Sequence, residues 1–135
     1  SLPKGKYSKL KPNFNDKKDI IGGLKALKKT NSYSHVQGVV MRNNRVVALE
    51  TNEGTEKMLR KIRKDSKINN GVLIKYPKKK QDLRVDLPTI GLDTLKQCKK
   101  AGIKGIVLKH KMNIFLNKKS SIKFANKNKM FILVK

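Results

Sequence analysis

Short apolar runs of strand length alternate along this chain with stretches of helical periodicity, and this alternation limits the fold more than any other feature. The strand-like runs are 39–41, 45–49, 71–75, 105–109, 113–116 and 130–134. The helical stretches are 16–29, 56–64, 93–100 and a short segment that Ser120 or Ser121 caps and that continues through Asn126. Strands interleaved with helices favour a sheet covered by helices. The sequence therefore predicts the α/β class: a single domain with a mixed β-sheet and covering helices.

Three local signals add detail to this pattern. Asn43-Asn44 separates two apolar runs, and asparagine tolerates the positive φ of a two-residue turn, which predicts a β-hairpin. Gly22-Gly23 weakens the first helix by roughly 2 kcal/mol relative to two alanines, unless a close approach there needs glycine. The lone cysteine, Cys98, shares an apolar helical face with its neighbours, which predicts a reduced, buried thiol.

Length and composition predict one domain that follows a connector. At 135 residues with 37% hydrophobic content, the chain falls in the common single-domain range. Residues 1–15 are polar and aperiodic and are predicted to be a connector, which leaves 16–135 as the domain. No apolar run approaches the length of about 18 residues that a transmembrane helix needs.

The formal charge of +25 is typical of proteins that bind polyanions. However, only 5 of the 34 basic residues are arginine. Arginine is the residue best suited to form bidentate hydrogen bonds with phosphates and bases. The few aromatic residues show no pattern typical of RNA stacking. No nucleic-acid partner is therefore expected, and the charge favours attraction to anionic membrane surfaces and anionic substrates.

The segment 78–88 has several charged side chains close together that can bind a metal ion or a phosphate. Asp82, Arg84 and Asp86 are two residues apart, so in an extended chain they project from one face, next to the lysines 78–80. Two carboxylates and a guanidinium beside lysines can hold a divalent cation together with a phosphate. The alternative is an edge strand with a charged, solvated face.

A family resemblance covers most of the chain, from about residue 16 to 134. The residues that carry it are Ala48-Leu49-Glu50, Glu53-Gly54-Thr55-Glu56, Gly71-Val72-Leu73-Ile74-Lys75, Lys78, Gln81-Asp82, Arg84, Asp86-Leu87-Pro88-Thr89-Ile90-Gly91 and Ala101-Gly102-Ile103-Lys104-Gly105-Ile106. In order and spacing they resemble the C-terminal domain of the bacterial UDP-2,3-diacylglucosamine pyrophosphatase family of lipid A biosynthesis. Two departures from the family pattern are Asn52, where an apolar residue is usual, and Gly38, where serine is usual.

The resemblance implies a metal-dependent hydrolase that cleaves the pyrophosphate of UDP-2,3-diacylglucosamine to 2,3-diacylglucosamine 1-phosphate and UMP. A cation, Mg²⁺ or Mn²⁺, would stabilise charge on the phosphoryl oxygens. The implied catalytic carboxylates are Asp86 and Asp82, which together with Glu53 and Glu50 are the implied metal ligands. The implied substrate-binding residues are Lys75, Lys78, Arg84, Gly54 and Thr55.

Ordinary structural roles stay open for these residues. Asp86 can be a turn or capping aspartate, Asp82 can pair with Arg84, and Glu50 and Glu53 can be surface acids. Gly54-Thr55 at a helix start offers backbone N–H groups to an anion, while Thr55 can instead cap the helix.

The resemblance also implies partners. They are a nucleotide-linked diacylated amino sugar, the family's N-terminal domain, to which nothing in this chain corresponds, and the inner membrane through peripheral contact from the cytoplasm. A homodimer is left open. The alternative from a different class is a non-enzymatic basic module that binds nucleic acid or another polyanion.

Overall fold

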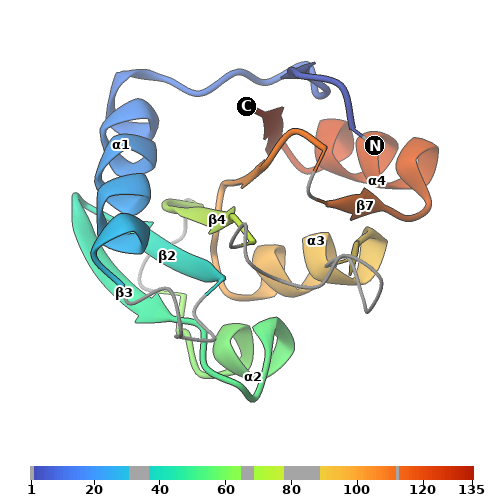
Figure 1. Ribbon diagram of the computed structural model, residues 1–135. Coiled ribbons are helices and arrows are strands. Elements are labelled where there is room, and N and C mark those ends of the chain that lie inside the picture. Colours follow the sequence, from blue (N-terminus) through green and yellow to red (C-terminus); the bar gives the residue numbers. More distant parts are fainter. Residues whose placement is uncertain (1, 31–36, 65–68, 78–88, 112) are drawn as a thin grey trace.

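The computed structural model describes residues 2–30, 37–64, 69–77, 89–111 and 113–135 (Figure 1). The helices in these ranges are α1 (Phe14–Lys29), α2 (Thr55–Arg60), α3 (Leu92–Lys100) and α4 (Lys118–Lys127). The strands are β1 (Gly5–Lys6), β2 (Gly38–Arg42), β3 (Arg45–Leu49), β4 (Val72–Lys75), β5 (Thr89–Ile90), β6 (Gly105–Leu108), β7 (Ile114–Phe115) and β8 (Phe131–Val134).

The main sheet has the strand order β1-β8-β6-β4-β2-β3. Its central strands β4, β6 and β8 are parallel to one another, and β1, β2 and β3 each pair antiparallel to a neighbour. A second, small sheet pairs β5 with β7 in parallel. The sheet is therefore mixed, as predicted.

Two apolar layers sandwich this sheet. On one face α1 packs against β2, β3 and β4 (Figure 1), and its Ile20 and Leu27 meet Val39, Val72 and Ile74. On the other face, Leu73, Ile106 and Ile132 pack with residues of α2, α3 and α4. Alternate residues of each buried strand serve the two layers, as the pleat requires. The predicted α/β class, a single domain with covering helices, is confirmed.

Close packing against the sheet explains the paired glycines, Gly22 and Gly23, of α1. A Cβ added at Gly23 would overlap Ile74 Cδ1 and would lie 3.0 Å from Met41 Cγ. The helix can therefore lie this close to β2 and β4 only with glycine at this position.

The predicted hairpin is present, and several other boundaries differ from prediction. Asn43 and Asn44 have φ of 52° and 63° and join β2 to β3. Helix α2 ends at Arg60 rather than near Lys64, and α4 begins after Asn117, whose backbone is left-handed, rather than at a serine cap. The stretch predicted to be a polar connector contributes β1 to the sheet edge and the buried Leu2 to the core.

Cys98 is buried in α3 as predicted, and we expect it to be inert in the folded protein. Its side chain is fully buried, and burial raises the pKa of the thiol to about 12. Burial therefore disfavours the thiolate, which is the reactive form. Labelling by a thiol reagent should be slow in buffer and rapid in 6 M urea. Fast stoichiometric labelling without denaturant would contradict this expectation.

Asp19 on α1 predicts a pH-dependent stability difference. Burial raises the pKa of this carboxyl, the Asn44 N–H at 2.7 Å from Oδ1 lowers it in part, and the charge of Asp16 raises it further. A raised folded-state pKa means that ionised Asp19 lowers stability at neutral pH, and that protonation at low pH removes this cost. Asp19→Asn keeps an acceptor for Asn44 and should be more stable than the wild type at pH 7.

Urea denaturation at pH 7 and at progressively lower pH measures this effect. The advantage of Asp19→Asn should shrink as the pH falls through the range where carboxyls protonate. An advantage of Asp19→Asn that is independent of pH would rule out ionisation as its cause.

Candidate functional site

The carboxyl ends of the parallel strands define one edge of the main sheet. Lys75, Leu108 and Val134 end β4, β6 and β8 side by side, and the register pairs Gly38, the first residue of β2, with Lys75. The backbone N–H of Glu50, just after β3, donates to the carbonyl of Gly38. Ligands of α/β domains bind preferentially outside this edge. The topology thus places Glu50 and Lys75 where such a site is expected.

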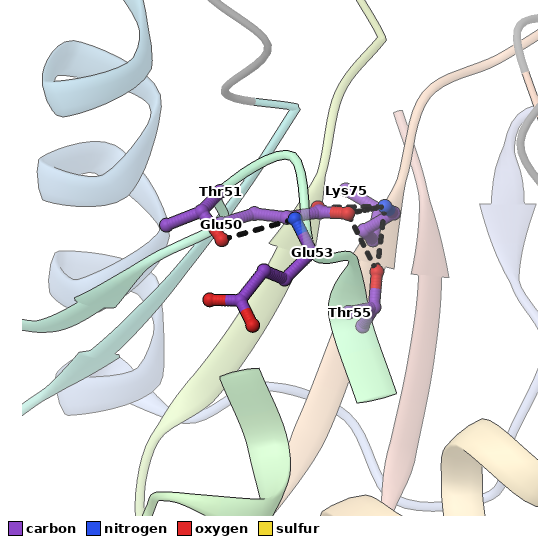
Figure 2. Close-up of polar contacts among 5 residues, drawn as sticks. All are labelled: Glu50, Thr51, Glu53, Thr55 and Lys75. Carbon is purple, nitrogen blue, oxygen red and sulfur yellow. Dashed lines mark hydrogen bonds and ion pairs between the residues drawn. The ribbon is translucent and has the colours of Figure 1, made fainter. Parts of the chain in front are cut away.

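Glu50, Lys75 and Thr55 form a closed polar cluster at this edge (Figure 2). Lys75 Nζ lies 2.7 Å from Glu50 Oε2, 3.0 Å from Oε1 and 2.8 Å from Thr55 Oγ1. The Thr55 hydroxyl donates to Glu50 Oε1 at 2.9 Å. The side chains of Lys75 and Glu50 are only 5% and 9% exposed. An ammonium group has three donors, and all three have partners here.

The cluster joins three elements. Glu50 follows β3, Lys75 ends β4, and Thr55 is the first residue of α2. The loop between β3 and α2 is therefore held against the end of β4, where the chain continues into the segment 78–88.

Gly38 leaves the room that this cluster occupies. A Cβ at this position would lie 2.6 Å from Glu50 Oε2 and 3.1 Å from Lys75 Cδ. Any larger residue would require the Glu50–Lys75 pair to shift. The glycine noted in the sequence as a departure thus adjoins the most buried ion pair of the described residues.

Glu53 is oriented differently from Glu50. Its carboxylate is about half exposed and pairs with Lys57 at 3.2 Å and with Lys61 at 3.8 Å. Figure 2 shows it turned away from the Lys75 ammonium. The structure therefore brings Glu50, Thr55 and Lys75 together and leaves Glu53 outside their cluster.

Gly54 supplies the turn into α2. Its φ of 97° lies in a region that glycine adopts readily, and no atom surrounds the position of its absent Cβ. No side chain caps this six-residue helix, and the hydroxyl of Thr55 is used by Glu50 and Lys75 instead. The capping role considered for Thr55 is therefore not observed.

The described residues do not by themselves fit a metal ion. No group of three potential protein ligands occurs among them. Glu50, the buried acid nearest the strand ends, already has Lys75 as its counter-ion on both oxygens. Four predicted site residues, Lys78, Asp82, Arg84 and Asp86, lie outside the described residues.

Sequence reasoning assigned Glu50 and Lys75 to separate ligands and missed that they bind each other. It also missed Arg42, whose buried guanidinium donates to the carbonyls of Asn70, Arg63 and Ala101. No short-range signal reveals either arrangement, because the partners are 21 to 59 positions apart.

Fold and site together define an α/β domain with a buried polar cluster at the carboxyl edge of its parallel strands. The chain belongs to the LpxI C-terminal domain family, whose model matches residues 3–133. It is 34% identical over 140 residues to a UDP-2,3-diacylglucosamine pyrophosphatase LpxI from Caulobacter vibrioides. That alignment covers 98% of this chain and 50% of the relative, so the chain spans about half the relative's length.

Proposed function

We propose that this domain forms part of the active site of a UDP-2,3-diacylglucosamine pyrophosphatase. The observation that carries the proposal is membership of the LpxI C-terminal domain family over nearly the whole chain, with a relative of that named activity. In the reaction a water oxygen bonds to one phosphorus and the bridging P–O bond breaks. The products are UMP and 2,3-diacylglucosamine 1-phosphate.

In this proposal the Glu50–Lys75–Thr55 cluster positions the chain around the reacting groups. Because all three donors of Lys75 already have partners, a phosphate oxygen can bind this ammonium only by replacing one of them. The cluster supports the proposal by holding the β3–α2 loop and the end of β4 in a fixed relation. Asp86 and Asp82 follow β4 in the sequence, and we assign the acid–base and water-orienting roles to them.

Metal dependence is part of the proposal and rests on the family resemblance. Its ligands would be Asp82 and Asp86, with Glu53 as the partly exposed acid on the neighbouring loop. The ion, Mg²⁺ or Mn²⁺, would stabilise negative charge on the phosphoryl oxygens.

The partners follow from the same proposal. Two acyl chains on the substrate imply work at a membrane surface, and the net charge of +25 favours peripheral contact with anionic lipid of the inner membrane from the cytoplasmic side. No helix of the described ranges is long and apolar enough to span a bilayer. The other half of the relative's length implies a second domain as a partner.

Hydrolysis of UDP-2,3-diacylglucosamine tests the proposal directly. The assay uses this chain alone and the longer polypeptide in which a family N-terminal domain precedes it, each with Mg²⁺, with Mn²⁺ and with chelator. We expect metal-dependent cleavage by the longer protein, abolished by Asp86→Ala and retained in the exposed-acid control Asp93→Ala. A folded longer protein that is inactive with every metal would refute the proposed function.

The excess of positive charge favours one alternative, a non-enzymatic module that binds nucleic acid or another polyanion. It predicts binding that weakens steeply as salt is raised, and no effect of Asp86→Ala on that binding. Titration of duplex and single-stranded nucleic acid at two salt concentrations distinguishes the two functions.

A further inference from the structure

A hollow in the surface lies at the other edge of the sheet from the Glu50–Lys75–Thr55 cluster. It has a volume of about 690 Å³ and lies between the end of α2, residues 61–64 and the end of α3. The Asn70 N–H donates to the carbonyl of Gly102, which places this region beside the start of β4, whereas Lys75 ends that strand. The hollow is therefore separate from the candidate site.

Its lining is richer in cations than the chain as a whole. The structure describes nine of the residues that line it. Five of these nine described residues are basic and none is acidic, whereas about a quarter of the chain, 34 of 135 residues, is basic. We call Arg60, Lys61, Arg63, Lys64 and Lys100 the basic hollow.

Two of the five cations have acidic partners outside the hollow. Arg60 pairs with Glu56 at 2.6 Å, and Lys61 lies 3.8 Å from Glu53. Among the described residues, no acid pairs with Arg63, Lys64 or Lys100. These three cationic residues line one concave surface, where positive charge raises the local concentration of anions.

The buried Arg42 holds the walls of the basic hollow together and removes an obstacle to anion binding. Its guanidinium donates to the Arg63 carbonyl at 3.1 Å and to the Ala101 carbonyl at 3.0 Å. Ala101 is the C-cap of α3, where unpaired carbonyls carry partial negative charge that would repel an anion. The positive charge of Arg42 offsets the partial negative charge at that end of α3. Its two hydrogen bonds also hold the segment that contains Arg63 and the end of α3 at a fixed spacing.

The lining also indicates the kind of anion. Its described lining residues include no aromatic side chain on which a base could stack, which disfavours single-stranded nucleic acid. Its volume lies within the range of small-molecule pockets. We propose that the basic hollow binds a compact polyphosphate, meaning a small anion with two or more adjacent phosphate groups. This inference does not depend on the proposed pyrophosphatase activity, because the hollow lies at the opposite sheet edge.

Calorimetric titration of this chain with inorganic tripolyphosphate, in 150 mM salt, tests the proposal. We expect saturable binding at one site, weakened at least tenfold in the triple variant Arg63→Gln, Lys64→Gln, Lys100→Gln. The matched control is Lys25→Gln, Lys28→Gln, Lys29→Gln, which removes the same charge from exposed positions of α1 on the other sheet face. The control should change affinity less than about twofold, and circular dichroism checks that both variants fold.

Three results would overturn the proposal. The first is equal weakening of binding by both triple variants, which would mean general charge attraction. The second is the absence of saturable binding at 1 mM tripolyphosphate, and the third is the binding of several anions per chain. A sedimentation assay with vesicles that contain phosphatidylglycerol tests whether the basic hollow binds a membrane surface. Loss of vesicle binding in the hollow variant alone, without tripolyphosphate binding by the wild type, would assign the hollow to a membrane surface instead.

Discussion

Replacement of Lys75 by methionine should lower the free energy of unfolding by about 3–5 kcal/mol, because it leaves the Glu50 carboxylate buried without its counter-ion. Glu50 is 9% exposed, and after the change its only remaining side-chain partner from the cluster is the Thr55 hydroxyl. Urea denaturation of the wild type and of Lys75→Met at pH 7 measures the difference. The loss is large relative to the total stability of a domain of this size.

The double variant Glu50→Gln, Lys75→Met separates a buried-charge effect from lost packing. It removes both charges, so it should lose clearly less stability than the sum of the two single variants. Glu56→Gln is the control for an exposed pair: Glu56 lies 2.6 Å from Arg60, but both side chains are more than half exposed. That control should cost less than about 1 kcal/mol. Additive losses in the double variant would mean that the pair does not interact as the geometry indicates.

A large coupling between Glu50 and Lys75 has a consequence for the site. A carboxylate that is needed to neutralise a buried ammonium is a poor candidate for a metal ligand, because coordination would leave the ammonium uncompensated. The prediction that Glu50 ligates a metal and that Lys75 contacts phosphate treats the two side chains as available. Their geometry instead favours a supporting role for both.

The fold was predictable where local sequence decides local structure. Asn43-Asn44 predicts a two-residue turn because such a turn needs positive φ at both positions and asparagine tolerates it. The observed φ values are positive at both residues. The buried strands and Cys98 were predictable because continuous apolar runs and an apolar helical face leave few alternatives. Element boundaries were less predictable: α2 ends at Arg60 although the apolar spacing continues to Ile62, which is buried beyond the helix end.

Three of the predicted site residues lie together in the structure, but their contacts with one another were not predictable. The resemblance singled out Glu50, Thr55 and Lys75 from separate stretches of sequence. Their mutual hydrogen bonds depend on β2 lying between β3 and β4, and on the absence of a side chain at Gly38. Neither condition can be read from any one segment. Asp82 and Asp86 lie outside the described residues, so their roles stay predictions.

Gly105 should tolerate no side chain, and its replacement by alanine should lower the free energy of unfolding by about 3 kcal/mol. In the register of the parallel strands β6 and β8, Gly105 is paired with Phe131. A Cβ at position 105 would overlap Cδ2, Cε2 and Cζ of the Phe131 ring. The ring is fully buried in the apolar layer that also contains Val107 and Ile74, so it can move aside only by displacing residues of that layer. Overpacking of this kind costs about 1–3 kcal/mol, and the fixed ring places this case at the upper end.

The partner variant Phe131→Leu tests whether the ring is the cause. Alone it should destabilise the protein, since it removes buried volume. Combined with Gly105→Ala it should lose less stability than the sum of the two single changes, because the smaller side chain makes room for the added methyl group. Gly54→Ala is the contrasting case: nothing surrounds that position, so only its backbone, with φ of 97° and ψ of 173°, opposes alanine, at a cost of about 1–3 kcal/mol. The loss at Gly54 should be independent of Phe131→Leu, and additive losses at Gly105 and Phe131 would rule out the ring as the cause.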